Sequence, residues 1–449
     1  MNLQGSMSSS NIKTSLSNRQ YIALAVPIII SQMTTPLLGA VDTAVVGHLS
    51  NPIYLGGVAV GSLIFNTLYW VLGFLRVSTS GFTSQAHGAN NHVELLYSLL
   101  RPMLIATSIG LLFILLQEPI KWAALNIINP TSGVADQAAL YYDIRIWGAP
   151  FALMSNVILG WLIGSSNVKL TLYLQIGMNV LNIVLDLVFV TSLNMGVAGV
   201  AVASLIAEVG VTIAGMLILI KLKLVNRMSI RLIKNIFEKS IFVKMIKVNG
   251  DLLIRSICLL TVYTLFTSKG AQMGEVELAA NAILFQLHLI MAYCLGGLGN
   301  ASSILIGRAI GANNVPLFTE TLKLSAKWGM LSGIFLSLLL FICSSFIYPI
   351  FTSIERVIQC IIQYQGWLLL FPIVGFWGII LNGVFSGATE AAQIRNSMFI
   401  AMVIFIVLIY VFIPAFGNHG LWLSFTIFTL FRSIVLGYYL PKLQKSCFE

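Results

Sequence analysis

The sequence predicts an all-α polytopic membrane protein in which twelve transmembrane helices form two six-helix bundles related by a parallel pseudo-two-fold axis. Three observations lead to this prediction. Of the 449 residues, 58% are hydrophobic and 9% are charged, and the mean hydropathy is +0.92, far from the composition of a soluble protein. Twelve apolar windows have the length of roughly 20 residues that a helix needs to cross a bilayer. The second half of the chain also repeats motifs of the first half at a constant spacing.

The apolar windows divide evenly between the two halves of the chain. They cover residues 21–46, 53–77, 95–116, 140–163, 170–190, 197–220, 252–267, 278–305, 322–342, 358–385, 397–414 and 421–440. Several exceed one crossing, so we expect tilted or kinked helices. We therefore expect an N-lobe at residues 1–220 with helices 1–6, a basic connector at 221–247, and a C-lobe at 248–449 with helices 7–12.

The distribution of basic residues predicts that both termini and the connector are cytoplasmic. The formal net charge is +10. Most Lys and Arg fall on one side of the membrane if the spans alternate, as the positive-inside rule requires of the cytoplasmic side. This pattern argues against nucleic acid as a partner and for contact with anionic lipid. The first apolar run is too long for the h-region of a signal peptide, so we expect the first helix to remain as a span.

An internal repeat predicts how the two bundles are related. QAHGANN at 85–91 follows the second span, and RAIGANN at 308–314 follows the eighth span, 223 residues later. The same spacing aligns WLIG at 161–164 with VFSG at 384–387. With six spans per half, both halves begin on the same side of the membrane, so the repeat is parallel, about an axis along the membrane normal. Such a pair of bundles encloses a central cavity.

Three acidic residues lie inside apolar spans of the first half, and the second half has no counterpart to them. They are Asp42, Asp186 and Glu208. A carboxylate at membrane depth is costly, so such groups usually face a cavity and serve ions, protons or substrate. At about 1.5 Å per helical residue, Asp42, Asp186 and Ser204 fall in the outer half of the bilayer, with Glu208 one turn deeper. Asn182 precedes Asp186 by one turn, so the two share a helix face.

These residues predict a site for a proton or a small cation. Two carboxyl groups brought together resist double ionisation, so Asp42 and Asp186 can load a proton on one side and release it on the other. Alternatively, Asp42, Asn182 and Asp186 can hold Na⁺, with Ser204 as a further neutral oxygen. A buried polar network that only locks helices together remains a third possibility. No basic partner for the acids is evident at this depth.

Five segments spread over nearly the whole chain form a combination that is more specific than any single motif. They are VDTAVVGHLSNPIYLGGVAVG (41–61), QAHGANN, LGWLIGSSN (159–167), LNIVLDLVFV (181–190) and FSGATEAAQIRNSM (385–398). Together they resemble the multidrug and toxic compound extrusion (MATE) family, in particular its prokaryotic DinF-like branch. The resemblance implies a two-lobe transporter of the cytoplasmic (inner) membrane with a V-shaped cavity, exporting cationic or amphipathic compounds in exchange for H⁺ or Na⁺.

The resemblance also implies roles for individual residues. Asp42 matches the essential aspartate of the first helix, and Asn182 and Asp186 match the fifth-helix pair of the N-lobe site. Ser204 stands where relatives often have threonine. Adaptable side chains on the expected cavity helices are candidates for substrate contact, because flexible thioethers suit a pocket that accepts several shapes, although each can equally serve helix packing. These candidates are Asp42, Met33, Thr35, Tyr141, Phe151, Met154, Asn156 and Met178.

The second half departs from the resemblance. Many relatives carry carboxylates in the seventh, eighth or tenth helix, but here Gly296, Ser303 and Asn382 stand at positions where an acid would not be surprising. A cation site in the C-lobe is therefore not expected. Asp251 and Arg255 are one turn apart at the start of the seventh helix and are expected to form a local ion pair.

The function that we expect is proton-driven export of small organic molecules by alternating access, with Na⁺ coupling as the alternative. A flippase for lipid-linked sugars is a second alternative, but it predicts a strongly basic central cavity for its pyrophosphate, whereas we expect the cavity helices to present acids. A channel would need a polar path along one helix face. No Walker loop, metal-ligand cluster or paired cysteine spacing indicates an enzyme or a cofactor other than the coupling ion. We expect a monomer in the bilayer.

Overall fold

The computed structural model describes residues 16–47, 52–222 and 238–448, with no side chain described at 34–47 or 239. These residues are almost entirely helical. The helices of the first half are α1 (Asn18–Gly47), α2 (Pro52–Val71), α3 (Phe74–Gly88), α4 (His92–Leu115), α5 (Gln117–Ile128), α6 (Ser132–Arg145), the 3-10 turn η1 (Ile146–Gly148), α7 (Ala149–Gly164), α8 (Val168–Asp186), the π-helix η2 (Leu187–Ser192) and α9 (Gly196–Lys221). Those of the second half are α11 (Lys239–Ala271), α12 (Glu275–Gly311), α13 (Val315–Phe351), α14 (Glu355–Gly387) and α15 (Ala391–Phe448).

The described helices account for twelve spans. Ten helical segments are long and apolar enough to cross a bilayer. The 30-residue α1 adds another span, and α15 counts as two because Gly417, at φ 54° and ψ −130°, interrupts its helical backbone. The twelve-helix prediction is thus confirmed. The short α5 has no buried residue and was not expected from hydropathy. Residues 223–237 of the predicted connector lie outside the described residues, and α11 already begins at Lys239.

The repeated motif builds the same helix–turn–helix in both halves. In the first copy Asn90 has φ 51°, and the Asn91 side chain caps α4 by accepting a hydrogen bond from the Glu94 backbone N at 3.0 Å. In the second copy Asn313 has φ 50°, and Asn314 caps α13 through the Leu317 backbone N at 2.9 Å. Asparagine tolerates this left-handed conformation and is a preferred N-cap, so the sequence GANN specifies the turn.

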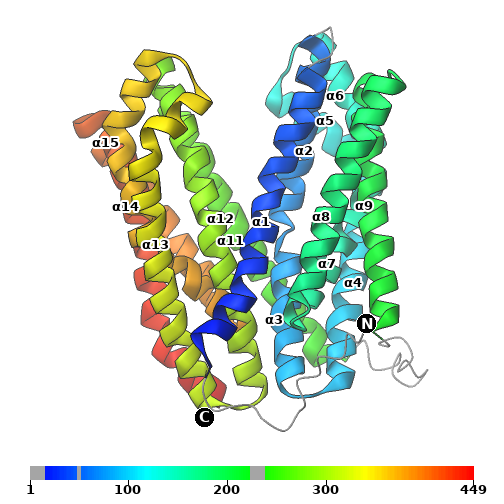
Figure 1. Ribbon diagram of the computed structural model, residues 1–449, viewed down its shortest axis with the longest axis vertical. Helices are drawn as coiled ribbons and strands as arrows, with labels where there is room; N and C mark the ends of the chain where they lie inside the picture. Colours follow the sequence, from blue (N-terminus) through cyan, green and yellow to red (C-terminus); the bar gives the residue numbers. More distant parts are fainter. Residues whose placement is uncertain (1–15, 48–51, 223–237, 449) are drawn as a thin grey trace.

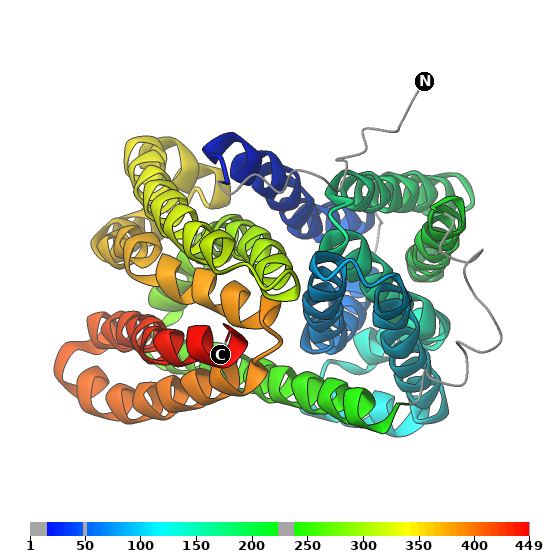
Figure 2. The same ribbon diagram turned by 90° about the horizontal axis from the view of Figure 1, so that it is seen from below.

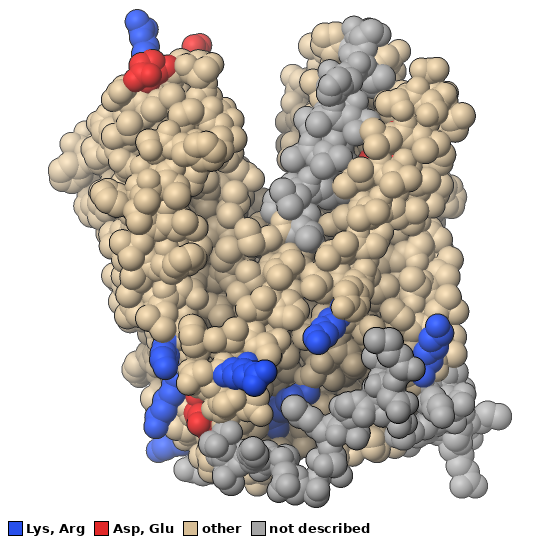
Figure 3. Space-filling model, in the orientation of Figure 1, with Lys and Arg blue, Asp and Glu red and all other residues tan. Residues whose placement is uncertain are grey.

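The two bundles form the arms of a V (Figure 1). The arms meet at the end where the C-terminus lies and separate toward the opposite end (Figure 1). The space-filling view shows the hollow between the arms, and on this face the Lys and Arg side chains gather mainly toward the closed end (Figure 3). Seen from the closed end, α11 runs from one bundle across to the other (Figure 2), and it contacts α3 as well as α12 and α15.

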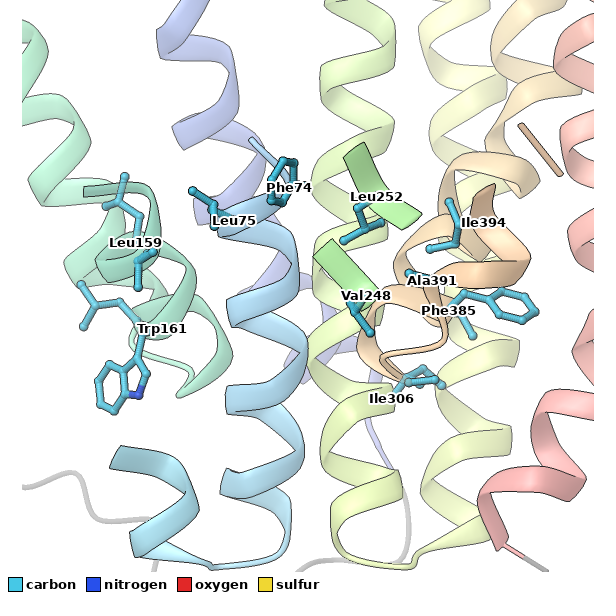
Figure 4. Packing of buried hydrophobic residues seen from close by; sticks show 14 of the residues in the cluster. Phe74, Leu75, Leu159, Trp161, Val248, Leu252, Ile306, Phe385, Ala391 and Ile394 are labelled. Carbon is cyan, nitrogen blue, oxygen red and sulfur yellow. The ribbon is translucent and has the colours of Figure 1, made fainter. Parts of the chain in front are cut away.

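An apolar core joins the bundles at the closed end. One buried cluster contains Phe74 and Leu75 of the first half together with Val248, Leu252 and other residues of the second. Figure 4 shows these side chains between the α3 side and the α11 side of the interface. Because burial of each such side chain contributes roughly 1.5–3 kcal/mol, this shared core holds the closed end together.

Glycines at the closed end confirm the pseudo-two-fold relation. A Cβ atom on Gly88 would overlap the backbone oxygen of Arg308, and one on Gly311 would overlap that of Gln85. These two contacts are the same contact made twice, since Gly311 and Arg308 follow Gly88 and Gln85 by 223 residues. Ser84 meets Gly307, its own counterpart in the repeat, so this pair lies at the axis. Reciprocal contacts of this kind are the signature of two-fold symmetry.

Candidate functional site

The buried face of α8 carries a row of polar side chains. Gln175, Asn179, Asn182 and Asp186 are all buried and follow one another at intervals of three or four residues, so they share one side of the helix. Asn182 donates a hydrogen bond to Ser204 Oγ of α9 at 3.5 Å. The structure thus brings together three of the residues expected to bind the coupling ion, and Asp186 is 0% exposed.

The helix changes its winding directly after this carboxylate. α8 ends at Asp186 and continues as the π-helix Leu187–Ser192. π-turns are uncommon and occur frequently at functional sites, because the wider turn re-aims the side chains beside it. Asp42 and Thr35 lie on α1, but their side chains are outside the described residues.

Polar groups continue along α8 toward the middle of the molecule. Ser31 of α1 donates a hydrogen bond to Gln175 Oε1. The same oxygen accepts a hydrogen bond from Arg76 Nη2 of α3 at 3.5 Å. The row that begins at Asp186 therefore reaches Arg76. Gln175 was not among the candidates from the sequence, although its position, a multiple of the helical repeat away from Asp186, places it on the same face.

Glu208 pairs with an arginine, which corrects the expectation that no basic partner reaches the acids. Arg145 Nη2 lies 3.1 Å from Glu208 Oε1, and the two side chains are only 13% and 11% exposed. Arg145 also donates to Tyr141 Oη at 2.6 Å and lies 5.0 Å from the centre of the Phe65 ring. Pairing, phenol and ring contacts together compensate the burial of the guanidinium. We therefore assign Glu208 to a structural ion pair between α6 and α9.

The expected substrate contacts divide into three groups. Tyr141 is fully buried beneath this ion pair, so in this conformation it contacts Arg145 and not a substrate. Met154 and Met178 pack against the apolar core, which is the ordinary role weighed for them. Phe151 is half-buried, and its backbone oxygen accepts a hydrogen bond from Thr212.

The remaining two candidates lie nearer to the space between the bundles. Met33 is 37% exposed, and its sulfur lies 3.6 Å from Cys294 Sγ of α12. Asn156 lines the central cavity described next. The described part of the chain thus places only Asn156, of the residues expected to contact substrate, on the wall of that cavity.

A cavity of about 380 Å³ lies between the bundles. Its wall includes residues of α1, α2, α3 and α7 from one half and of α11, α12, α14 and α15 from the other. The charged residues on the wall are Arg76, Arg255 and Arg432, and none of the residues that line it is Asp or Glu. This corrects the expectation that acids face the central cavity.

The C-lobe ion pair also differs from the expectation. Asp251 Oδ1 lies 2.5 Å from Arg395 Nη1, so its partner is on α15 and not Arg255. Arg255 instead lines the cavity, and its Nε has no hydrogen-bond partner among the described residues. Neither Arg76 nor Arg432 was considered from the sequence. Both stand inside apolar stretches, GFLRVSTSG and TLFRSIVLG, and an ionisable residue at membrane depth was a sufficient signal.

His288 was missed for a different reason. It is 3% exposed and lines the cavity, and its ring centre is 4.0 Å from that of Phe371 and 5.0 Å from that of Phe425. A single histidine in an apolar helix is usually a packed core residue. Its place on the wall follows only from how the C-lobe helices meet. Among the described residues, no group of three or more His, Cys, Asp or Glu side chains could hold a metal ion.

Comparison with known proteins decides the family. A family model described as MatE matches residues 27–188 and 252–411. The chain belongs to the MatE family. It is 37% identical to DNA damage-inducible protein F of Escherichia coli (strain K12), over 92% of this chain and 90% of that protein. It is 26% identical to multidrug and toxin extrusion protein 1 of Danio rerio, over 90% of this chain and 69% of that protein. The resemblance to the DinF-like branch is confirmed.

Solved MATE structures share the fold of this chain. An outward-facing MATE transporter of the MOP superfamily superposes with a TM-score of 0.83 at 17% identity, over 97% of both chains. A MOP superfamily transporter from Pyrococcus furiosus, described as having a binding pocket of reverse polarity that suggests a different function, gives a TM-score of 0.85 at 17% identity, over 97% of this chain and 98% of that one. The MatE protein studied here is a multi-pass membrane transporter and not an enzyme.

Proposed function

We propose that this MatE protein is a secondary active exporter that moves amphipathic small molecules out of the cell in exchange for H⁺. Asp186 carries the proposal. It is fully buried, and it lies beside Asn182 and Ser204, at the start of a π-helix. A carboxylate held at membrane depth is costly in its charged form, so proton uptake favours the buried geometry and proton release favours a wetter one. Alternating access can use that difference.

The polar row along α8 supports coupling between this carboxylate and the cavity. Through Gln175 the row ends at Arg76, which lines the cavity. A change of charge at Asp186 therefore has a hydrogen-bonded route toward the cavity wall. In this mechanism Asp42 acts with Asp186, as the resemblance implies, and Glu208 holds α6 to α9 without taking part in coupling.

Na⁺ is the second candidate for the coupling ion. Asp42, Asn182 and Asp186, with Ser204, would supply carboxylate and neutral oxygens of the kind that a hard cation prefers. Of these, Asn182 and Ser204 lie within hydrogen-bond distance of each other. Transport driven by a Na⁺ gradient at equal pH on both sides would favour this alternative.

The orientation that we propose places the closed end of the V in the cytoplasm. Basic side chains gather toward that end on the face in Figure 3, as expected for the cytoplasmic side. The hollow then opens to the outside. This orientation, with both termini cytoplasmic and the protein in the inner membrane, agrees with export. We propose that a single chain is the transporting unit, since one chain already encloses the cavity.

The test is gradient-driven transport in proteoliposomes. Fluorescent amphiphiles of positive, zero and negative charge would be offered under a pH gradient and, separately, under a Na⁺ gradient. We expect Asp186→Asn to abolish proton-driven transport while the variant still inserts and melts normally. The matched control is Asp143→Asn, because Asp143 is a half-exposed acid that pairs with Lys121. An Asp186→Asn protein that still exchanges protons for substrate would overturn the assignment.

A lipid-linked substrate is the second candidate function, and one observation favours it. A flippase for lipid-linked sugars was expected to have a strongly basic central cavity, and the described cavity is lined by three arginines and no acid. Transport of a fluorescent polyprenyl pyrophosphate between leaflets, with no transport of soluble amphiphiles, would favour this function over drug export.

A further inference from the structure

We propose that the central cavity binds the anionic group of an amphipathic organic molecule among Arg76, Arg255 and Arg432. The group would be a phosphate, sulfonate or carboxylate, joined to an aromatic or alkyl body. This inference rests on the proposed export function and names its substrate class. It replaces the cationic compounds that the resemblance implies.

The three arginines come from different helices and meet only in the folded protein. Arg76 lies on α3, Arg255 on α11 and Arg432 on α15, and all three line the same cavity. α3 belongs to one bundle, and α15 to the other. A ligand held by all three would therefore touch both arms of the V, which a transported substrate must do if its binding is to influence their closure.

The cavity arginines differ from the other buried arginines of the described chain in lacking a carboxylate partner. Arg101 pairs with Glu94 at 2.5 Å, Arg145 pairs with Glu208 at 3.1 Å, and Arg395 pairs with Asp251 at 2.5 Å. Each of these pairs joins structural elements. Within the described residues no ion pair involves the arginines of the cavity.

The contacts that the cavity arginines do make leave most of their hydrogen-bond donors available. Arg76 has one hydrogen bond, to Gln175 Oε1 at 3.5 Å. Arg255 Nε has no partner. Arg432 lies 5.5 Å from the centre of the Phe428 ring. A guanidinium has five donors in a planar fork that matches the oxygens of carboxylate and phosphate. Three incompletely bonded guanidiniums around one space are therefore arranged for an anion, and they repel a cation.

The rest of the wall fits an apolar body. Tyr263, Phe371, Phe425 and Phe428 line the cavity, and aromatic rings offer large, rigid contact surfaces. The volume of about 380 Å³ lies in the range of small-molecule sites. An anionic head with a ring or a short chain would therefore satisfy both the charge and the apolar surface of the cavity.

The test measures equilibrium binding without any gradient, so it is independent of coupling. The probe is 8-anilinonaphthalene-1-sulfonate, titrated into protein in nanodiscs, with ethidium as the cationic comparison. We expect saturable binding of the sulfonate. Arg255→Gln and Arg432→Gln should each weaken it about ten- to hundredfold, the usual effect of losing a charge-assisted hydrogen bond. Arg432→Lys should weaken it less. Lys323→Gln, which removes an exposed charge on α13, should leave affinity unchanged.

Two further arms separate the possible outcomes. Competition by a soluble arylphosphate, compared with a short-chain polyprenyl phosphate, distinguishes a free anion from a lipid head group as the source of the anion; competition by either supports the proposal. Asp186→Asn should bind the sulfonate like the wild type. If it does so and still transports, the coupling proposal fails while this one stands. Sulfonate binding that ignores all three arginine substitutions in correctly folded protein, or tighter binding of ethidium than of the sulfonate, would overturn the inference.

Discussion

The ion pair between Arg145 and Glu208 yields a prediction that separates a structural carboxylate from a coupling one. Glu208→Gln preserves the shape of the side chain but leaves the guanidinium without its counter-charge. Because the two side chains are only 13% and 11% exposed, water cannot replace the lost partner. Breaking a buried pair on one side costs about 3–5 kcal/mol. Tyr141 still accepts a hydrogen bond from Arg145 at 2.6 Å, so we take the lower end, about 3 kcal/mol.

This cost translates into a measurable melting shift. At about 2.1 cal/mol/K per residue, a chain of 449 residues has an unfolding entropy of roughly 0.9 kcal/mol/K, so a loss of about 3 kcal/mol lowers Tm by about 3 °C. Tryptophan fluorescence during heating in detergent measures this shift. The double variant Arg145→Met with Glu208→Leu should recover most of the loss, since replacing both members of a buried pair by apolar groups is often neutral.

Transport by the same variant decides the role of Glu208. We expect the single variant to keep proton-driven transport at a temperature well below its Tm. A Glu208→Gln protein that melts like the wild type yet has lost proton-driven transport would refute the structural assignment and return Glu208 to the coupling site.

Two other contacts give further predictions. Gly311→Leu should force the bundles apart where its side chain meets the Gln85 backbone, so spin labels across the closed end should report a longer distance; Gly177→Ala, which has open space around it, should leave the distance unchanged, and equal distances in all three proteins would contradict the packing. Asp251→Asn should lower Tm by about 1–3 °C, because Asp251 is 7% exposed and Arg395, at 33%, can turn toward water; an unchanged Tm would show that this pair contributes nothing.

Much of the fold follows from the sequence for physical reasons. Hydropathy identifies spans because every backbone polar group in a bilayer must be bonded within its own helix. The repeat spacing predicts the pseudo-two-fold because equal sequences such as GANN make equal turns. Helix phase correctly places Asn182 and Asp186 on one face. The exposed helix α5 escaped because it neither crosses the bilayer nor buries a side chain.

The parts of the site that the sequence did not reveal depend on how distant helices meet. Arg145 and Glu208 are 63 residues apart, and no periodicity joins them. Asp251 turned from its neighbour Arg255, one turn away, to Arg395 on another helix. The charge of the cavity was misjudged because acids in apolar spans drew attention that the arginines of the same spans equally merited.

The duplicated glycine contacts at the closed end make its opening a single event. Ser84 and Gly307 sit at the axis, with one copy of the Gly88 and Arg308 contact on each side of it. Any tilt of the arms that separates one copy separates the other as well. These contacts are between backbones, so they offer no intermediate side-chain rearrangement by which the arms could loosen gradually. The transporter is thereby built as a bistable rocker with one paired latch, which limits leakage between its two states.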